Sequence, residues 1–323
     1  MRKEWRRLTK QYEIESLRNG RAFYRWRCVV SEEEKDYKIE FQKDVDKEEE
    51  KDIIKLSEIS KTLVNFENHL QKWISNPKNH KFNKDTEIKI EKHYKKLIDE
   101  NSFGMRVKYS SLKQIIKDNC FKNQLETNTS GGVLDLQGRK EISEFLFGTD
   151  ISNAENKDFE KYGYLCDGNP KLDFDNNKLV NQYGNVCVRF KKDKIKRCTT
   201  FTSGDSLDEI RVYGNNYRPS SVENPSFSSE VDPYVKYQDN DDLLKHLNKA
   251  SKPYIELQYH GKITLDDVES VSIDCFNYIA KDINDIAEMI SGKGIKVYRT
   301  TEMNYERVLE EYDKDTKKWI YIK

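Results

Sequence analysis

The spacing of apolar residues changes at about residue 101, and this change limits what the chain can fold into. Before it, apolar residues recur every three or four positions, as in the a/d stripe of an α-helix, at Leu56, Ile59, Leu63, Phe66, Leu70 and Trp73. The stripe ends at Asn76-Pro77, because the residue before a proline disfavours the helical conformation. A second helix is predicted over residues 87–98. The stripe can pack within its own bundle or against a partner.

Short strand-like runs separated by polar turns follow residue 101. Strands are predicted over residues 105–107, 186–191, 197–202, 254–259, 268–273 and 295–299, and helices over 111–117 and 278–290. The runs 186–191 and 197–202 are expected to be adjacent strands around a charged turn. We therefore expect an α+β fold, with a helical N-terminal domain over 1–100 and a mixed, split β-sheet domain over 101–323.

Residues 214–240 are predicted to form a long loop, since they are rich in Ser and Asn and hold three of the six prolines. Loops of this length in a compact domain are usually functional or disordered.

Composition removes several classes of protein. The 57 Lys and Arg balance the 57 Asp and Glu, and 11% aromatic residues supply a core. No apolar run approaches the ~20 residues that span a bilayer, and charged residues follow Met1, so a soluble, cytoplasmic protein without a membrane partner is expected. The six cysteines form no C-x-x-C pair and the five histidines no H-E-x-x-H, so we expect buried thiols and no metal site.

The charge is uneven along the chain. Residues 1–30 hold nine basic and three acidic side chains, interleaved with Trp5, Phe23, Tyr24 and Trp26. Such a segment could contact nucleic acid through phosphates and stacking. The alternative is a solvated helix that pairs with the acidic residues 31–50.

Several enzyme classes lack their motifs here. The sequence has no G-x-G-x-x-G, no G-x-x-x-x-G-K-[ST], no G-x-S-x-G and no kinase signature. What remains are polar residues at a strand spacing of two, in Thr200 and Thr202 and again in Glu256, Gln258 and His260. Alternation of this kind places each polar set on one face of a sheet. For any one strand, a solvated face is the plain explanation.

Taken together and in order, these segments carry a resemblance to a known family. The segments are Phe103-Gly104-Met105-Arg106-Val107, Phe121-Lys122-Asn123-Gln124 with Thr129-Ser130-Gly131-Gly132, Tyr162-Gly163-Tyr164-Leu165, Phe201-Thr202-Ser203-Gly204-Asp205-Ser206 and Glu256-Leu257-Gln258-Tyr259-His260-Gly261. Residues 103–275 resemble an uncharacterised bacterial family of ADP-ribosyltransferase-like proteins, within the ADP-ribosyltransferase superfamily. The last two motifs are the most specific.

The resemblance implies roles for particular residues. Arg106 would grip a phosphate or ribose of NAD, Thr200, Thr202 and Ser203 would line the nicotinamide pocket, and Glu256 would be the catalytic carboxylate. Breaking the bond between nicotinamide and ribose creates an oxocarbenium-like centre, which a fixed carboxylate stabilises. His260 would position the ribose or the acceptor, or make a structural hydrogen bond in the turn at Gly261.

One departure from the superfamily pattern concerns the catalytic strand. The catalytic Glu usually stands last in an [E/Q]-x-E triplet, whereas Gln258 holds that place here and Glu256 the first. Either the register differs by two residues and keeps the same face, or the fold is a degenerate binding scaffold.

The expected function is transfer of ADP-ribose from NAD to an intracellular macromolecule, either a protein or a nucleic acid. The chain could be the toxin of a toxin–antitoxin or phage-defence system, with an antitoxin or regulatory partner bound through the N-terminal helices. The rival is a non-catalytic protein that binds nucleic acid or a partner.

Overall fold

The computed structural model describes residues 84–129, 135–176, 178–207, 220–221, 255–276, 279–304 and 306–322. The apolar stripe at residues 56–73, the basic segment 1–30 and most of the loop predicted over 214–240 lie outside these residues. Contacts divide the chain into two compact units, Met1–Ile59 and Ser60–Lys323. All the described residues belong to the second unit.

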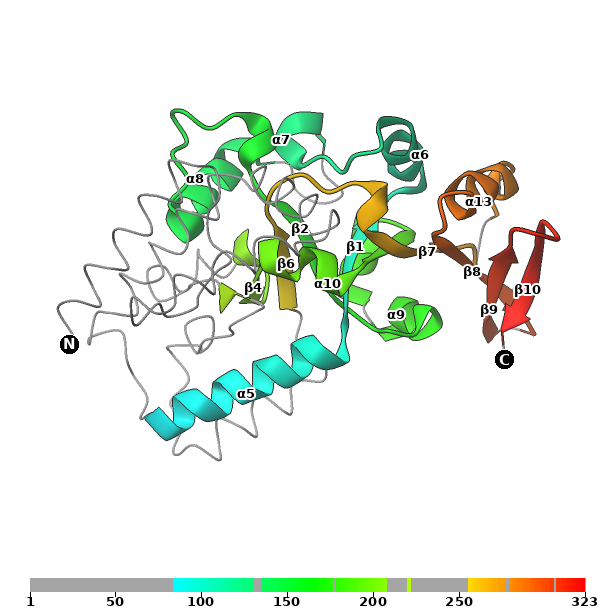
Figure 1. Ribbon diagram of the computed structural model, residues 1–323, viewed down its shortest axis with the longest axis horizontal. Coiled ribbons are helices and arrows are strands. Elements are labelled where there is room, and N and C mark those ends of the chain that lie inside the picture. The colour runs from blue at the N-terminus through cyan, green and yellow to red at the C-terminus, as the bar shows by residue number, and fades with distance from the viewer. Residues whose placement is uncertain are drawn as a thin grey trace, which may run out of the picture. The chain divides into compact units, whose positions relative to one another are not determined.

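A mixed sheet of ten strands organises the described part of the chain (Figure 1). The strands are β1 (Ser102–Val107), β2 (Lys161–Cys166), β3 (Val186–Phe190), β4 (Thr199–Ser203), β5 (Ser220–Ser221), β6 (Ile255–Tyr259), β7 (Val268–Asp274), β8 (Lys296–Met303), β9 (Glu306–Asp313) and β10 (Lys318–Ile322). Their order is β10-β9-β8-β7-β3-β1-β2-β6-β4-β5. Strands β7 and β8 pair in parallel, and the other neighbours are antiparallel. The α+β class with a mixed sheet is thereby confirmed.

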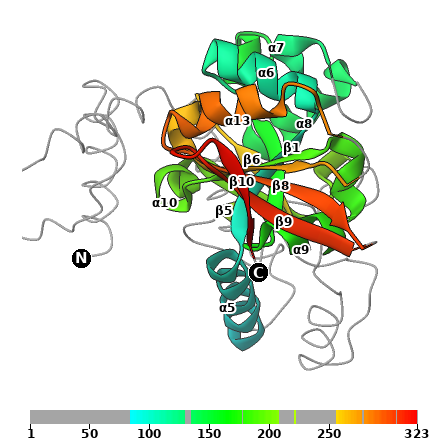
Figure 2. The same cartoon turned by 90° about the vertical axis from the view of Figure 1, so that its right-hand side faces the viewer.

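The described helices flank this sheet (Figures 1 and 2). They are α5 (Lys84–Glu100), α6 (Tyr109–Asp118), α7 (Gln124–Thr127), α8 (Leu136–Phe147), α9 (Pro170–Asn176), α10 (Lys192–Ile195) and α13 (Ile283–Ser291). In both views α5 extends away from α6 and α7, at the opposite end of the fold.

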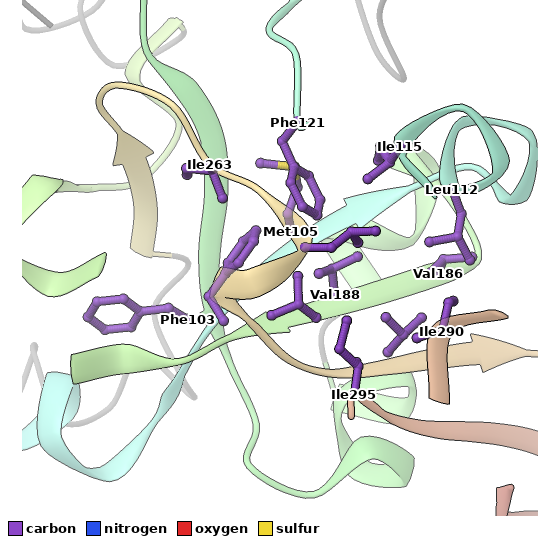
Figure 3. Packing of buried hydrophobic residues seen from close by; sticks show 14 of the residues in the cluster. Phe103, Met105, Leu112, Ile115, Phe121, Val186, Val188, Ile263, Ile290 and Ile295 are labelled. Carbon is purple, nitrogen blue, oxygen red and sulfur yellow. The ribbon is translucent and has the colours of Figure 1, made fainter. Parts of the chain in front are cut away.

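Alternation along the central strands gives the sheet an apolar face and a polar face. On the apolar face, Phe103 and Met105 of β1 and Val188 of β3 pack in one large core with residues of α5, α6 and α13 (Figure 3). The intervening residues of the same strands point to the other face, since neighbours along a strand alternate. A smaller cluster there contains Tyr164 of β2 and Phe174 of α9. This second face carries the polar motifs.

Helix α5 belongs to the large core. Ile90, Tyr94 and Ile98 are buried in it at a helical spacing of four, and the Tyr94 ring stacks on Phe201 of β4 with centroids 5.4 Å apart. Helix α5 therefore packs in the same core as the strands that follow it. Only Asn101 lies between the end of α5 at Glu100 and the start of β1 at Ser102. The domain boundary between residues 100 and 101 stays a prediction.

The adjacency predicted for the runs 186–191 and 197–202 is wrong. They form β3 and β4, but β3 lies between β1 and β7, while β4 pairs with β6 and β5. The residues between them are not a hairpin turn, because they form α10 and a 3-10 turn at Lys196–Cys198. This connection carries the chain from one part of the sheet to another.

Most other predicted elements are confirmed, with shifted ends. The predicted strands at 105–107, 254–259, 268–273 and 295–299 correspond to β1, β6, β7 and β8, and the predicted helices at 87–98, 111–117 and 278–290 to α5, α6 and α13. Strands β2, β9 and β10 and helices α8 and α9 were not anticipated.

Candidate functional site

Strands β4 and β6 bring the two predicted polar sets directly opposite each other. In their antiparallel register, Thr202 faces Glu256 and Thr200 faces Gln258. Directly opposed residues on antiparallel strands share a face of the sheet. Ser203 lies in the same strand at the position opposite Ile255. The five residues Thr200, Thr202, Glu256, Gln258 and His260 are called the Glu256 cluster below.

Hydrogen bonds join the Glu256 cluster into one chain. The Gln258 amide donates to Glu256 Oε1 at 3.0 Å and to Thr202 Oγ1 at 2.9 Å. Its carbonyl oxygen accepts from the Thr200 hydroxyl at 3.0 Å. Because the Thr200 proton is used there, His260 Nε2, 2.9 Å from Thr200 Oγ1, is the donor in that contact. The Glu256 carboxylate therefore fixes which way the Gln258 amide points.

Glu256 is a buried carboxylate whose pKa is strongly raised. Its side chain is 2% exposed. Burial, and then the carboxylate of Asp205, raises the pKa of Glu256 to about 7, against the lowering effects of Arg139, the Ser206 N–H and the Gln258 amide. A buried carboxyl group that titrates near neutral pH is typical of functional sites, although structural networks also produce such shifts.

The turn after β4 completes the surroundings of Glu256. Gly204 has a φ of 81°, a left-handed conformation that most other residues avoid. The turn that follows brings the Ser206 N–H to 3.3 Å from Glu256 Oε1. This gives a local physical reason for the Gly-Asp-Ser part of the motif.

His260 is buried and neutral. Burial, with a smaller contribution from Lys161, lowers its pKa to about 3. Its ring packs edge-on against Phe147 of α8, with centroids 4.8 Å apart. The turn at Gly261 is held separately, because its carbonyl accepts from Lys161 Nζ at 2.7 Å. His260 is thus a hydrogen-bonding group and not an acid at neutral pH.

Strand β2 borders the cluster on the other side of β6. Tyr162 lies opposite Gln258, and Tyr164 lies opposite Glu256. Between them, Gly163 has no room for a side chain, since an added Cβ would lie 2.4 Å from the Tyr259 ring and 2.2 Å from the Gly104 carbonyl oxygen. Close packing therefore explains why the middle residue of the Tyr-Gly-Tyr motif is glycine.

Helix α8 packs on this face through residues spaced four apart. Arg139 lies over the Tyr162 ring, 4.3 Å from its centre, and Ser143 donates to Glu160 Oε2 at 2.8 Å. Phe147 contacts His260, as described above. The helix is started by Asp135, whose carboxylate accepts from the Gly138 N–H at 2.8 Å.

Arg106 belongs to a second polar group on the same face. We call Arg106, Tyr164, Asp173 and Arg189 the Arg106 cluster. Arg106 Nη2 donates to Asp173 Oδ2 at 2.8 Å, and the Tyr164 hydroxyl donates to the same oxygen at 2.7 Å. Arg106 also lies 3.9 Å from the centre of the Phe174 ring. The guanidinium is 1% exposed, and its Nε and Nη1 have no hydrogen-bond partner among the described residues.

A small cavity is lined by residues of α7, α8 and β2. It measures about 10 Å³, which is about the space that one water molecule needs. Its lining residues are Asn123, Gln124, Leu125, Arg139, Phe159, Glu160 and Tyr162. The Gln124 Oε1 and the Arg139 Nε and Nη1 are buried there without hydrogen-bond partners in the described part of the chain.

Comparisons with known proteins give no family assignment. No protein-family model matches the chain, and no curated protein is similar to it in sequence. Within the described ranges, no cluster of His, Cys, Asp and Glu could hold a metal ion. The described helices include none with the length and apolar character needed to cross a bilayer.

The structure brings some of the predicted residues together and separates others. Thr200, Thr202, Glu256, Gln258 and His260 form one network, whereas Arg106 lies two strands away and is paired with Asp173. The arginine that acts on Glu256 is Arg139, which sequence reasoning missed, together with Asp205. A signal for Arg139 existed in the interval of four residues that separates Arg139 from Ser143 and Ser143 from Phe147. Without the strand order, however, nothing indicated which surface that helix face covers.

Proposed function

We propose that this protein transfers ADP-ribose from NAD to a macromolecule, with Glu256 as the catalytic carboxylate. The observation that supports this most is the position of Glu256, which is hydrogen-bonded to Gln258, opposite Thr202 and buried on the polar face of the sheet. The order of the parts also agrees with the resemblance, since an Arg lies on the first strand, a Thr-rich strand follows, and a Glu lies on a later strand.

The reaction assigns a definite task to each group. The bond between ribose C1′ and the nicotinamide nitrogen breaks, and its electron pair leaves with nicotinamide. An acceptor nucleophile then bonds to C1′ and loses its proton. The ionised Glu256 stabilises the positive charge that develops on the ribose, and a carboxylate fixed before the reaction does so with little reorganisation. Gln258 holds the carboxylate in place, and Thr202 holds Gln258.

Arg106 has the charge and the free donors that a diphosphate group of NAD would need. Arg106 has two buried nitrogen atoms without partners, and a guanidinium suits a diphosphate. The cavity lined by Arg139 and Tyr162 has room for about one water molecule, so this cavity is not the proposed NAD site.

Burial of the network also favours a second candidate function. A fully hydrogen-bonded, enclosed set of side chains is what a non-catalytic binding scaffold would retain for stability. In that case the protein binds nucleic acid or a protein partner and leaves NAD intact.

One experiment separates the two functions. Purified protein is incubated with adenine-labelled NAD and a cell extract, nicotinamide release is measured, and protease and nuclease digestions show whether protein or nucleic acid carries the label. Glu256→Gln should lower the rate at least about a hundredfold, as expected when one preorganised charge is removed. Glu269→Gln, an exposed carboxylate on β7, is the matched control. No NAD turnover by the parent protein with any extract would leave the binding scaffold as the function.

The wider setting is part of the same proposal. The acceptor would be an intracellular protein or nucleic acid, and the protein would act in the cytoplasm as an effector, such as the toxin of a toxin–antitoxin or phage-defence system. The proposed antitoxin or regulatory contact falls on N-terminal residues outside the described ranges.

A further inference from the structure

Two buried arginines meet at one carboxylate on the polar face of the sheet. Arg106 Nη2 lies 2.8 Å and Arg189 Nη2 lies 3.9 Å from the same oxygen, Asp173 Oδ2. The Arg106 side chain is 1% exposed and the Arg189 side chain 3% exposed. The two guanidinium groups therefore lie beside each other, away from water.

The strand register explains why the two arginines converge. Arg189 of β3 lies directly opposite Gly104 of β1, and Arg106 follows Gly104 by two residues, so both arginines share one face of the sheet. Diagonal neighbours of this kind on antiparallel strands are within reach of each other when their side chains are long. The fold itself thus places two like charges next to each other.

The donors of the two guanidinium groups are only partly used. Arg106 Nη2 donates to Asp173, as described above. Arg189 donates to the Asp167 carbonyl oxygen at 3.2 Å through Nε and to Ser272 Oγ at 2.7 Å through Nη1. Arg106 Nε and Nη1 and Arg189 Nη2 have no hydrogen-bond partner among the described residues. Both arginines therefore keep N–H donors that could bind another acceptor.

The same cluster holds more positive than negative charge. In the described part of the chain, Asp173 is the one carboxylate that forms an ion pair with either arginine. Asp173 also accepts from the Tyr164 hydroxyl at 2.7 Å and from the Asp167 N–H at 3.1 Å. One carboxylate does not neutralise two buried guanidinium groups, and a buried charge without compensation is strongly unfavourable. A second anion would remove this imbalance.

We propose that Arg106 and Arg189 together form a binding site for a phosphate or diphosphate group. A guanidinium matches the spacing of phosphate oxygens, and a phosphate has enough oxygens to accept from both arginines. This assigns a binding role to Arg189, which Ser272 orients. The site follows from the donors and charges described above. That its phosphate comes from the diphosphate of NAD rests on the proposed function, and a phosphorylated ligand unrelated to NAD is the other source.

Helix α9 is the described element that lies against Arg106. It supplies Asp173 and also Phe174, whose ring centre is 3.9 Å from the guanidinium. Because both arginine side chains are almost fully buried, an anion reaches their unused nitrogen atoms only when residues that cover them shift. Binding is therefore measured after long incubation.

The thiol of Cys187 is a second group nearby that can carry negative charge. Its sulfur lies 3.4 Å from the Tyr164 hydroxyl. Burial raises the pKa of this thiol, but the hydrogen bond with Cys166 and the charges of the two arginines lower it below its usual value. An ionised Cys187 would itself neutralise the second arginine, so the test includes Cys187→Ser.

The test measures anion binding by the full chain and needs no turnover. Protein dialysed into phosphate-free buffer is incubated with pyrophosphate or inorganic phosphate, and binding is followed by ³¹P NMR and by the midpoint of thermal unfolding. The parent midpoint should rise with pyrophosphate concentration, because a ligand that binds the folded state stabilises it. Arg189→Gln should weaken pyrophosphate binding at least about tenfold, as expected when a charge-assisted hydrogen bond is lost. Arg299→Gln is the matched control, since Arg299 is already paired with Glu310 at 2.7 Å, and it should leave the affinity unchanged.

Three results would overturn the proposal. The first is that the parent binds neither anion, and the second is equal affinity in a folded Arg189→Gln protein. If Arg189→Gln does not fold, Arg189→Lys replaces it, because lysine keeps the charge but loses the planar fork, and equal affinity there counts in the same way. The third is binding that appears only in Cys187→Ser, which would assign the second negative charge to the thiolate. Ser272→Ala should weaken binding by a smaller factor than Arg189→Gln.

Further measurements identify the source of the phosphate and separate this inference from the proposed function. NAD should compete with pyrophosphate, whereas nicotinamide riboside, which has no phosphate, should not. Pyrophosphate binding that NAD does not displace supports the site and assigns it to another phosphorylated ligand. Pyrophosphate binding in a protein that consumes no NAD refutes the transferase and leaves the site. NAD consumption by a protein that binds neither anion refutes the site and leaves the transferase.

Discussion

The Glu256 cluster and the Arg106 cluster lie on the same face of one sheet, and both are buried, but their charges are balanced differently. Arg106 makes a direct ion pair with Asp173, at 2.8 Å. Glu256 accepts hydrogen bonds from the neutral Gln258 and Ser206, and its charged neighbours act from α8 and from the turn after β4.

This difference indicates what each cluster can do. A tightly paired arginine stabilises one arrangement, and removing either partner leaves the other charge buried without compensation. A carboxyl group whose pKa is about 7 can change its ionisation near neutral pH. We therefore propose that the Asp173 pair of Arg106 holds the fold, and that the proposed chemistry takes place at the Glu256 cluster.

The largest expected effect tests the structural side of the comparison. Asp173→Asn leaves the Arg106 guanidinium buried without its carboxylate, and we expect a loss of about 3–5 kcal/mol in the free energy of unfolding, measured by urea denaturation. Asp175→Asn on the same helix is the control. Its pair with Arg307 is partly exposed, with side-chain exposures of 16% and 43%, so it should cost less than about 1 kcal/mol. Equal losses in the two variants would contradict the distinction.

The next-largest expected effect is a gain in stability, for Glu256→Gln. Because the pKa of Glu256 is raised to about 7 in the folded protein, from 4.5 ordinarily, the native state binds the proton more tightly than the unfolded state. The stability from this group is complete below pH ~4.5 and is lost as the pH rises through about 7. Glu256→Gln should therefore be more stable than the parent by about 3 kcal/mol at pH 8, with little difference at pH 4. A Glu256→Gln protein less stable at pH 8 would show that the carboxylate is structural.

Arg106→Lys is expected to have an intermediate effect. Lysine keeps the charge opposite Asp173 but loses the planar fork, so the free energy of unfolding should fall by about 1.5–3 kcal/mol. If the unpartnered Nε and Nη1 bind the diphosphate, NAD consumption should also fall by roughly one to three orders of magnitude. Unchanged turnover would remove Arg106 from the site and leave it in the structural cluster alone.

The smallest effect concerns the hydrogen bonds that hold Gln258. Thr202→Val keeps the shape of the side chain and removes the oxygen that accepts from the Gln258 amide at 2.9 Å. The free energy of unfolding should fall by about 1 kcal/mol. Thr301→Val on β8, whose hydroxyl donates to Glu310 in a half-buried site, is a comparison outside the cluster. A larger loss at Thr301 than at Thr202 would indicate that the network contributes little to stability.

Local patterns predicted the strands well, because alternation is a property of neighbouring residues. Thr200 and Thr202, and likewise Glu256 and Gln258, were placed on one face from their spacing alone, and their register confirms that the two sets face each other. Strand order is not a local property. Nothing between residues 191 and 199 reveals that β3 and β4 lie in different parts of the sheet.

The long-range parts of the site could not be predicted for the same reason. The pairing of Arg106 with Asp173 joins residues 67 positions apart and depends on where α9 packs. The action of Arg139 on Glu256 depends on α8 crossing β2 and β6. Arg106 on the first strand was assigned to NAD by resemblance alone. Arg139, the arginine that lowers the pKa of Glu256, was identified only from the structure.

The place of β6 in the sheet has a consequence for how the protein is made. Strand β6 lies between β2 and β4, both of which are synthesised long before it. Until residue 259 has left the ribosome, β2 and β4 each have an unpaired edge, and such edges favour association with other chains. The emerging chain also lacks Glu256 and Gln258 for most of its synthesis. A ribosome that stops before β6 therefore releases a product without the proposed catalytic group and with two exposed strand edges, which favours aggregation over activity.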